Sequence, residues 1–238
     1  VEEAPSAVLN SDLRHKMGQA AIDVARSCDY RGAGTVEFLL DSDHNFYFLE
    51  MNTRLQVEHP VTELITGVDL VEEQIKVALN EALSFSQDDL SITGHAIELR
   101  VYAEDPLNDF LPDIGKITDY EVPDFNFVRL DDAYESGETI PIYYDPMIAK
   151  ITAHGDTREE ALTAMDAALR DTRIAGVKTN LAFLSALVAE PDFRSGDVDT
   201  GLIARDIDAL TAVPKVEARH VALAGMAALD LLEPRADA

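Results

Sequence analysis

The chain has 238 residues, of which 47% are hydrophobic, so it is long enough for one large or two modest domains with a real core. Aspartate and glutamate number 45 against 19 lysines and arginines, and the formal charge of −26 argues against binding to nucleic acid or anionic lipid. No apolar run approaches the roughly 20 residues of a membrane span, and no signal peptide is recognisable.

The acidic residues are dispersed and form no long tail. Strong salt shortens the range of charge repulsion, so this composition suggests a halophilic, salt-adapted source. The single cysteine, Cys28, excludes an internal disulfide and fits a reducing cytoplasm. Because Cys28 lies on a helical pattern with no catalytic motif around it, we expect a small core residue.

Periodicity and turn residues divide the first part of the chain into a few elements, and a linker rich in Ser, Asp and Gln follows over residues 82–94. We place a domain boundary between residues 83 and 84. The expected elements are coil over 1–10, a helix over about 11–28 with Ser11 as N-cap, an antiparallel hairpin over 35–40 and 45–51, and a helix over 69–81 with Asp69 as N-cap.

The second part, residues 84–210, predicts a small antiparallel sheet with flanking helices, and residues 211–238 predict a linker and terminal helix. The overall class is therefore α+β. The expected strands are 95–104, 115–121, 126–131, 138–143 and 147–154, and the expected helices are 157–173 with Thr157 as N-cap, 180–189, 202–210 and 217–232.

A run of alternating polar residues after the hairpin is the most informative stretch of the chain. If the chain stays extended up to Pro60, alternate side chains share one face. A solvated strand is the simpler interpretation, but two amides and an arginine between two carboxylates favour a functional site. The residues on this face are Glu50, Asn52, Arg54, Gln56 and Glu58.

Two further charged residues leave alternatives open. Hairpin pairing could bring Glu37 beside Glu50, where a divalent cation such as Mg²⁺ or Mn²⁺ would relieve the repulsion, with Asn52 as a neutral oxygen donor. The alternative is an ion pair of Glu37 with a nearby arginine, either Arg31 or Arg54. For Arg100, which alternates with the apolar positions of its strand, a surface salt bridge is the better interpretation from pattern alone. Its candidate partners are Glu98, Glu104 and Asp105.

Together these stretches resemble biotin carboxylase, the ATP-grasp component of biotin-dependent carboxylases, over roughly residues 1–210. The string from Glu50 to Glu63 is specific, because other ATP-grasp enzymes share the acids and the asparagine but not the continuation RLQVEHPVTE. The resemblance implies the C-terminal part of an ATP-grasp domain followed by a biotin carboxylase C-terminal domain. The stretches that carry it are 31–38, 46–63, 94–100, 103–106, 115–118, 143–150 and 176–180.

The resemblance also implies roles for individual residues. Glu37 and Glu50, supported by Asn52, would bind the divalent ions that bridge the phosphates of ATP, and Leu39 would touch the adenine. Glu58 would be the general base that deprotonates bicarbonate, and Arg54 would hold the carboxyphosphate intermediate. The implied bicarbonate pocket consists of Arg54, Gln56, the backbone of Val57 and Glu58, and Arg100 would stabilise the biotin enolate.

The implied function is ATP-dependent carboxylation of biotin on a carrier protein, within an acetyl-CoA or propionyl-CoA carboxylase α subunit of fatty acid metabolism. The implied partners are a biotin carboxyl carrier protein, a carboxyltransferase and a second copy of the chain. Since the chain begins at Val1 and holds no glycine-rich lid, we expect a fragment that does not turn over ATP alone. Carbamoyl-phosphate synthetase, which also activates bicarbonate, and a non-catalytic assembly module are the competing hypotheses.

Overall fold

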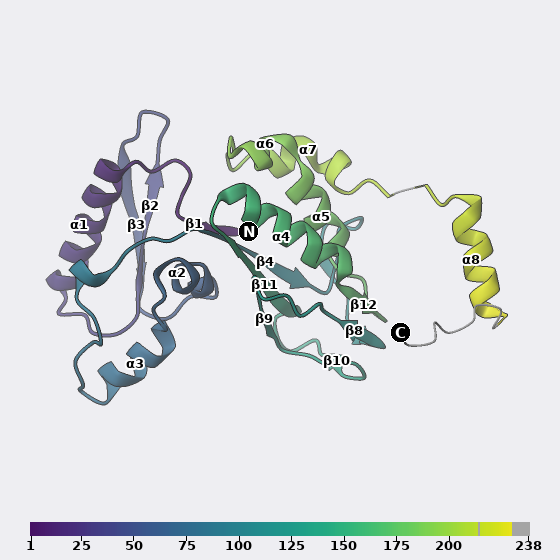
Figure 1. Ribbon diagram of the computed structural model, residues 1–238, viewed down its shortest axis with the longest axis horizontal. Helices are drawn as coiled ribbons and strands as arrows, with labels where there is room; N and C mark the ends of the chain where they lie inside the picture. The colour runs from purple at the N-terminus through teal and green to yellow at the C-terminus, as the bar shows by residue number, and fades with distance from the viewer. Residues whose placement is uncertain (214, 230–238) are drawn as a thin grey trace.

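The computed structural model describes residues 1–213 and 215–229, and an antiparallel sheet of four strands lies at its centre (Figure 1). The strand order is β1-β4-β11-β9. Residues 1–10 were expected to be coil, but β1 pairs with β4 through Glu3 opposite Ile97. The four strands are β1 (Glu2–Ala4), β4 (His95–Tyr102), β11 (Met147–Gly155) and β9 (Val128–Asp132).

One face of this sheet carries the main hydrophobic core. Ile97 and Leu99 on β4 and Ile151 on β11 have no exposed surface, and α4 (Arg158–Asp171) packs over them. The predicted N-cap of α4 is confirmed, since Thr157 accepts from the backbone of Glu160 in a capping box. Three further helices complete this layer: α5 (Leu181–Ala189), α6 (Pro191–Ser195) and α7 (Leu202–Leu210).

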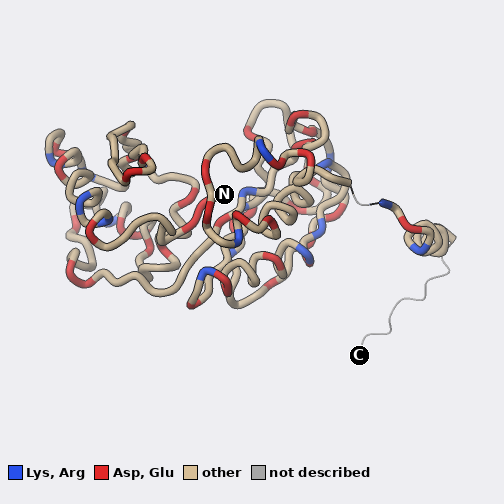
Figure 2. Tube along the Cα trace, turned by 90° about the horizontal axis from the view of Figure 1, so that it is seen from above, with Lys and Arg blue, Asp and Glu red and all other residues tan. Residues whose placement is uncertain are grey.

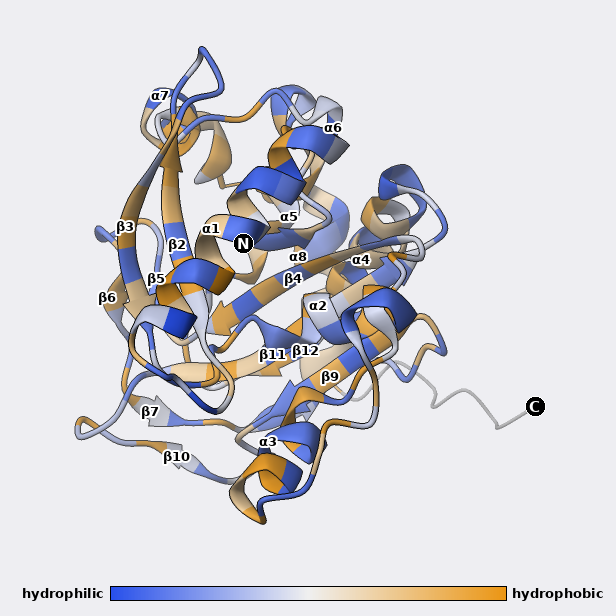
Figure 3. Cartoon of the chain, turned by 90° about the vertical axis from the view of Figure 1, so that its left-hand side faces the viewer, coloured by the Kyte–Doolittle hydropathy of each residue, from blue (hydrophilic) through white to orange (hydrophobic). Residues whose placement is uncertain are grey.

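The opposite face of the sheet is covered by α2 (His59–Thr66), whose Val61 and Ile65 bury Ala96 of β4. Hydrophilic and hydrophobic segments alternate along β4, as its two-sided environment requires (Figure 3). Glu98 lies on this second face and has no exposed surface, although the sequence pattern placed it at the surface. The error arises because alternation shows which residues share a face and says nothing about what covers that face.

The N-terminal part contains the predicted hairpin and two of the predicted helices. β2 (Thr35–Leu40) pairs with β3 (Phe46–Asn52) through a bulge, and α3 (Leu70–Ala78) has the expected cap, Asp69. For α1 (Ser11–Ser27) the cap is Asn10 and not Ser11, since the Asn10 side chain accepts from the backbone of Leu13. Cys28 is exposed, so the expectation of a core cysteine is wrong.

The remaining short strands pair in twos and do not extend the central sheet. The expected strand 115–121 is two strands with different partners: β7 pairs with β10, and β8 pairs with β12. The bounds are β5 (Glu104–Asp105), β6 (Leu111–Pro112), β7 (Gly115–Lys116), β8 (Asp119–Glu121), β10 (Thr139–Ile140) and β12 (Arg173–Ala175), with a 3-10 turn, η1 (Gln87–Asp89), in the expected linker.

The terminal helix α8 (Ala218–Ala228) has no buried residue and lies apart from the other helices (Figure 1). The end of the predicted helix, up to residue 232, falls outside the described residues. Acidic positions are spread through residues 1–213, as the dispersed composition implied (Figure 2). Within residues 1–213 and 215–229, none of the helices has the length and apolar character needed to cross a membrane.

Candidate functional site

The hairpin brings the two predicted metal-binding carboxylates together. Glu37 lies directly opposite Glu50 in the register of β2 and β3. The Asn52 amide donates to Glu37 Oε1 at 2.7 Å and to Glu50 Oε1 at 3.3 Å, and the Gln56 amide donates to Glu37 Oε1 at 2.9 Å. Glu37 is therefore bound by two amides, and the alternative ion pair with Arg31 or Arg54 is not formed.

The chemistry of this cluster fits a divalent cation that is shared with a ligand. Among the described residues, no group of three or more His, Cys, Asp or Glu side chains is placed to hold a metal. Mg²⁺, however, is usually bound by one or two carboxylates together with substrate phosphates and water. Two adjacent carboxylates and an amide that can turn its oxygen outward match that coordination.

The polar run after the hairpin is not the extended strand that its alternation predicted. β3 ends at Asn52, residues 53–58 form a loop, and Glu58 is the N-cap residue of α2. Pro60 lies in the first turn of that helix, where a missing backbone N–H costs nothing, so it begins a helix where we expected it to end a strand. The loop lets Gln56 return to Glu37 of the hairpin while Glu58 reaches Arg100 of the central sheet.

The loop brings Glu58 to Arg100 of β4. Arg100 Nη2 lies 2.9 Å from Glu58 Oε2 and 3.4 Å from Glu2 Oε1, so the expected salt bridge of Arg100 with Glu98, Glu104 or Asp105 is replaced by these contacts. Burial disfavours the charged form of Arg100, but hydrogen bonding with Tyr102 and the carboxylates of Glu2 and Glu58 raise its pKa above the ordinary value. Arg100 therefore stays cationic beside the carboxylate of Glu58.

Arg100 also borders open space. It lines a cavity of about 400 Å³ together with Glu2, Tyr102, Glu104 and Asn180. The Asn180 side chain holds the adjoining backbone, since it accepts from Tyr102 N at 2.9 Å and donates to Arg100 O at 3.1 Å. The guanidinium is thus fixed at the edge of a space that a ligand could enter.

The structure does not join two of the predicted site residues to these clusters. Arg54 is exposed and donates to the carbonyl of Leu55 at 3.2 Å, so its predicted contact with an intermediate stays a prediction. Leu39 is 57% exposed on β2, two residues from Glu37 and hence on the same face of the strand. An exposed leucine beside the carboxylates is compatible with its expected contact to adenine.

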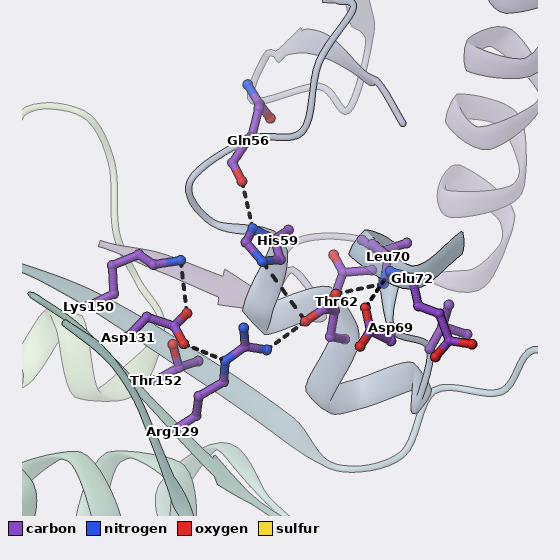
Figure 4. A network of polar contacts seen from close by, with 12 residues as sticks. Gln56, His59, Thr62, Asp69, Leu70, Glu72, Arg129, Asp131, Lys150 and Thr152 are labelled. Atoms are coloured by element: carbon purple, nitrogen blue, oxygen red, sulfur yellow. Dashed lines mark hydrogen bonds and ion pairs between the residues drawn. The ribbon is translucent and has the colours of Figure 1, made fainter. Parts of the chain in front are cut away.

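Sequence reasoning missed the basic residues that reach α2 and its preceding loop from the central sheet (Figure 4). Lys150 Nζ of β11 donates to the carbonyl of Val57 at 2.7 Å, and Arg129 of β9 binds Glu63 at 2.6 Å. The available signal was a pair of polar residues at alternate positions in each strand. Those pairs are Glu98 and Arg100 in β4, Lys150 and Thr152 in β11, and Arg129 and Asp131 in β9.

Comparison with known proteins identifies both parts of the chain. Residues 98–205 match the family model described as biotin carboxylase C-terminal domain, and residues 1–86 match the carbamoyl-phosphate synthase L chain, ATP binding domain. The chain is 51% identical over 203 residues to biotin carboxylase 2 of Bacillus subtilis, covering 85% of this chain and 46% of that protein. It is 47% identical to the propionyl-CoA carboxylase alpha chain of Ruegeria pomeroyi, covering 95% of this chain and 37% of that protein.

A solved structure agrees with these relatives. The biotin carboxylase domain dimer of Hydrogenobacter thermophilus 2-oxoglutarate carboxylase, in complex with MgADP, ADP and bicarbonate, superposes with a TM-score of 0.86 at 40% identity. The match covers 89% of this chain and 47% of that one, so the chain spans less than half the length of each of these three proteins. The α+β class is confirmed, and the chain belongs to the biotin carboxylase family.

Proposed function

We propose that this chain supplies the bicarbonate-binding and cation-binding side of a biotin carboxylase active site. The observation that carries the proposal is the ion pair between Glu58 and Arg100, which joins the N-terminal helix α2 to the central sheet at 2.9 Å. A carboxylate held beside a fixed guanidinium is a suitable base for a small acidic anion, because the cation attracts the anion that the carboxylate deprotonates.

Each residue then has a defined task. Glu58 removes the proton of bicarbonate, so that the freed oxygen can attack the γ-phosphate of ATP. Arg54, on the exposed loop, orients the carboxyphosphate that results, and Arg100 stabilises negative charge that develops next to Glu58. Gln56 and the backbone of Val57 complete the bicarbonate pocket. These assignments follow the family resemblance.

ATP, a divalent cation and carrier-bound biotin are the groups this site would serve. When bound, the cation neutralises phosphate charge and biotin accepts the carboxyl group. Glu37 and Glu50, with Asn52, would hold the cation against the phosphates, and Leu39 would cover one side of the adenine. The face of β2 that carries Glu37 and Leu39 suits both contacts, because it presents a carboxylate and an apolar side chain two residues apart.

The organisation and partners of the whole protein are part of this proposal. The matched ranges 1–86 and 98–205 support a boundary near residues 83 and 84, with a further segment over 211–238. The relatives that are propionyl-CoA carboxylase alpha chains favour a biotin carrier domain and a carboxyltransferase as partners. The dimeric biotin carboxylase domain of Hydrogenobacter favours a homodimer.

The test replaces Glu58 by glutamine in a complete biotin carboxylase that contains these residues together with an ATP-binding lid. We expect bicarbonate-dependent release of ADP to fall by roughly 10²- to 10⁴-fold, because the amide cannot accept the proton. Glu121→Gln, which alters an exposed pair with Arg173, is the matched control and should leave the rate unchanged. Stimulation by free biotin separates this reaction from carbamoyl phosphate synthesis. A Glu58→Gln variant with the parental rate would refute the assignment of the base.

A further inference from the structure

Three neighbouring strands of the central sheet each direct one basic side chain at residues 57–63, which we call the 57–63 segment. Arg100 of β4 binds the carboxylate of Glu58, Lys150 of β11 binds the carbonyl of Val57, and Arg129 of β9 binds the carboxylate of Glu63. Lys150 is central in this row, because it lies opposite Arg100 on one side and Asp131 on the other. Figure 4 shows Lys150 and Arg129 beside the start of α2.

The burial of Lys150 argues for a directed role. The residue is only 8% exposed, and an ammonium group is costly to bury unless it is fully paired. Its partners are the Val57 carbonyl at 2.7 Å and Asp131 Oδ2 at 3.2 Å. Packing alone does not require an ammonium group here, because an apolar side chain of the same length would occupy the same space. The charge instead serves the contact with the loop.

The contact with the Val57 carbonyl constrains Glu58 directly. The carbonyl of Val57 and the N–H of Glu58 belong to one planar peptide unit, so fixing one fixes the orientation of the other. Asp131 in turn holds Lys150 from the next strand, and Arg129 Nε holds Asp131 at 3.0 Å. The position of Glu58 is therefore set from two directions: by Arg100 at its carboxylate and by Lys150 at its backbone.

We propose that Lys150 is a positioning residue, which holds the Val57–Glu58 peptide so that Glu58 and the backbone of Val57 face bicarbonate. The inference rests on the proposed function for its kinetic consequence, but the placement of the peptide by Lys150 is independent of turnover. The site on the N-terminal part of the chain is then shaped by β9 and β11 of the central sheet.

The first experiment compares Lys150→Met and Lys150→Arg in the same complete biotin carboxylase that is used to test Glu58. For Lys150→Met we expect kcat/KM for bicarbonate to fall by at least about tenfold while KM for ATP changes by less than about twofold, since only the 57–63 segment is misplaced. Lys150→Arg keeps a donor and should recover much of the loss. Lys178→Met is the matched control, because it removes a lysine paired with Asp105 that does not touch the 57–63 segment.

The second experiment measures hydrogen exchange of a peptide covering residues 55–62. His59 N and Val61 N bind the carbonyls of Gln56 and Glu58 at 3.4 and 3.3 Å, so their exchange reports the order of this segment. In Lys150→Met we expect these amides to exchange about tenfold faster while the amides of β4 and β11 keep their protection. Lys178→Met should match the parent.

The outcomes separate the two proposals. If the parental enzyme shows no bicarbonate-dependent release of ADP, the proposed function is refuted. The hydrogen-exchange measurement still decides the role of Lys150. Parental exchange in Lys150→Met overturns the positioning role, and so does a loss of protection spread through the whole sheet. Equal losses toward ATP and bicarbonate would likewise show a general structural role and overturn the proposal.

Discussion

Glu98 is the residue whose environment departs most from its sequence pattern. It lies two residues before Arg100 on β4 and has no exposed surface, and Thr152 donates to its Oε2 at 3.1 Å while its Oε1 lacks a partner among the described residues. Burial raises the pKa of Glu98 to about 7, an effect that the positive charge of Lys150 and the Thr152 hydrogen bond oppose. Near neutral pH this carboxyl group is thus close to half-protonated.

Replacing Glu98 by glutamine should change how stability depends on pH. Because the folded pKa of about 7 is above the ordinary value of 4.5, the favourable contribution of Glu98 is complete below pH 4.5 and is lost as the pH rises through 7. Glutamine does not ionise. The free energy of unfolding of Glu98→Gln, relative to that of the parent, should therefore rise by roughly 2–3 kcal/mol between pH 5 and pH 8. Urea unfolding at the two pH values measures this gain.

Thr152→Val provides a second variant for the same measurement. Loss of the hydroxyl removes a donor that favours the ionised carboxylate, so the loss of stability toward pH 8 should be larger in Thr152→Val than in the parent. A pH-independent difference between the parent and Glu98→Gln would contradict a raised pKa for Glu98.

At the scale of elements, β4 and β11 determine the site because they carry Glu98, Arg100, Lys150 and Thr152 side by side. Gly94, just before β4, allows this strand to meet the end of β11 at close distance, and Gly155, at the end of β11, leaves room for the first turn of α4. A Cβ at Gly94 would lie 2.4 Å from the carbonyl oxygen of Gly155, and Gly94 also has a φ of +71°. No other residue type fits this position without moving the strands.

Gly94→Ala should therefore destabilise the protein more than a positive φ alone explains. We expect a loss of about 3–5 kcal/mol, from backbone strain together with the overlap on Gly155. Gly67→Ala is the matched control, because Gly67 has a φ of +73° but open space around its Cβ position. It should lose about 1–2 kcal/mol. Chemical denaturation measures both, and equal losses would show that the contact with Gly155 is unimportant.

At the scale of the whole molecule, charge is the dominant feature. The formal charge of −26 is spread over both parts of the chain, so folding brings many like charges closer together (Figure 2). The favourable pairs at the site, such as Arg100 with Glu58, are few against this excess. Mutual repulsion of the surface acids should therefore oppose folding in dilute buffer.

Raising KCl from about 0.05 M to 2 M should increase the melting temperature, most steeply at the lower end, where the Debye length shortens fastest. A variant with four exposed aspartates changed to asparagine should depend less on salt. The four positions are Asp43, Asp88, Asp124 and Asp208. If salt raises the melting temperature of the parent and of the variant equally, the effect comes from general exclusion of salt and not from charge screening. The hypothesis of a salt-adapted source would then lose its support.

Local sequence signals were sufficient wherever the cause of a structure is itself local. Asp69 and Thr157 cap their helices through hydrogen bonds to residues three positions ahead, and the turn at residues 41–44 sets the hairpin that places Glu37 opposite Glu50. The string from Glu50 to Glu63 identified the family for the same reason, since its chemistry is contiguous in the chain. The loop at 53–58 was missed, because alternation of polar residues also occurs in loops.

The sequence by itself determined the class of fold, the family and the pairing of two carboxylates. Only the tertiary structure decided that Arg100 binds Glu58, that Lys150 holds Val57, that Glu98 is buried and that Cys28 is exposed. Each of these depends on which strands are neighbours and which element covers their second face. Residue spacing along one strand carries no information on partners that lie 42 positions away, as Glu58 does from Arg100, or 93 positions away, as Val57 does from Lys150. Only the contacts between distant segments in the folded chain reveal these partners.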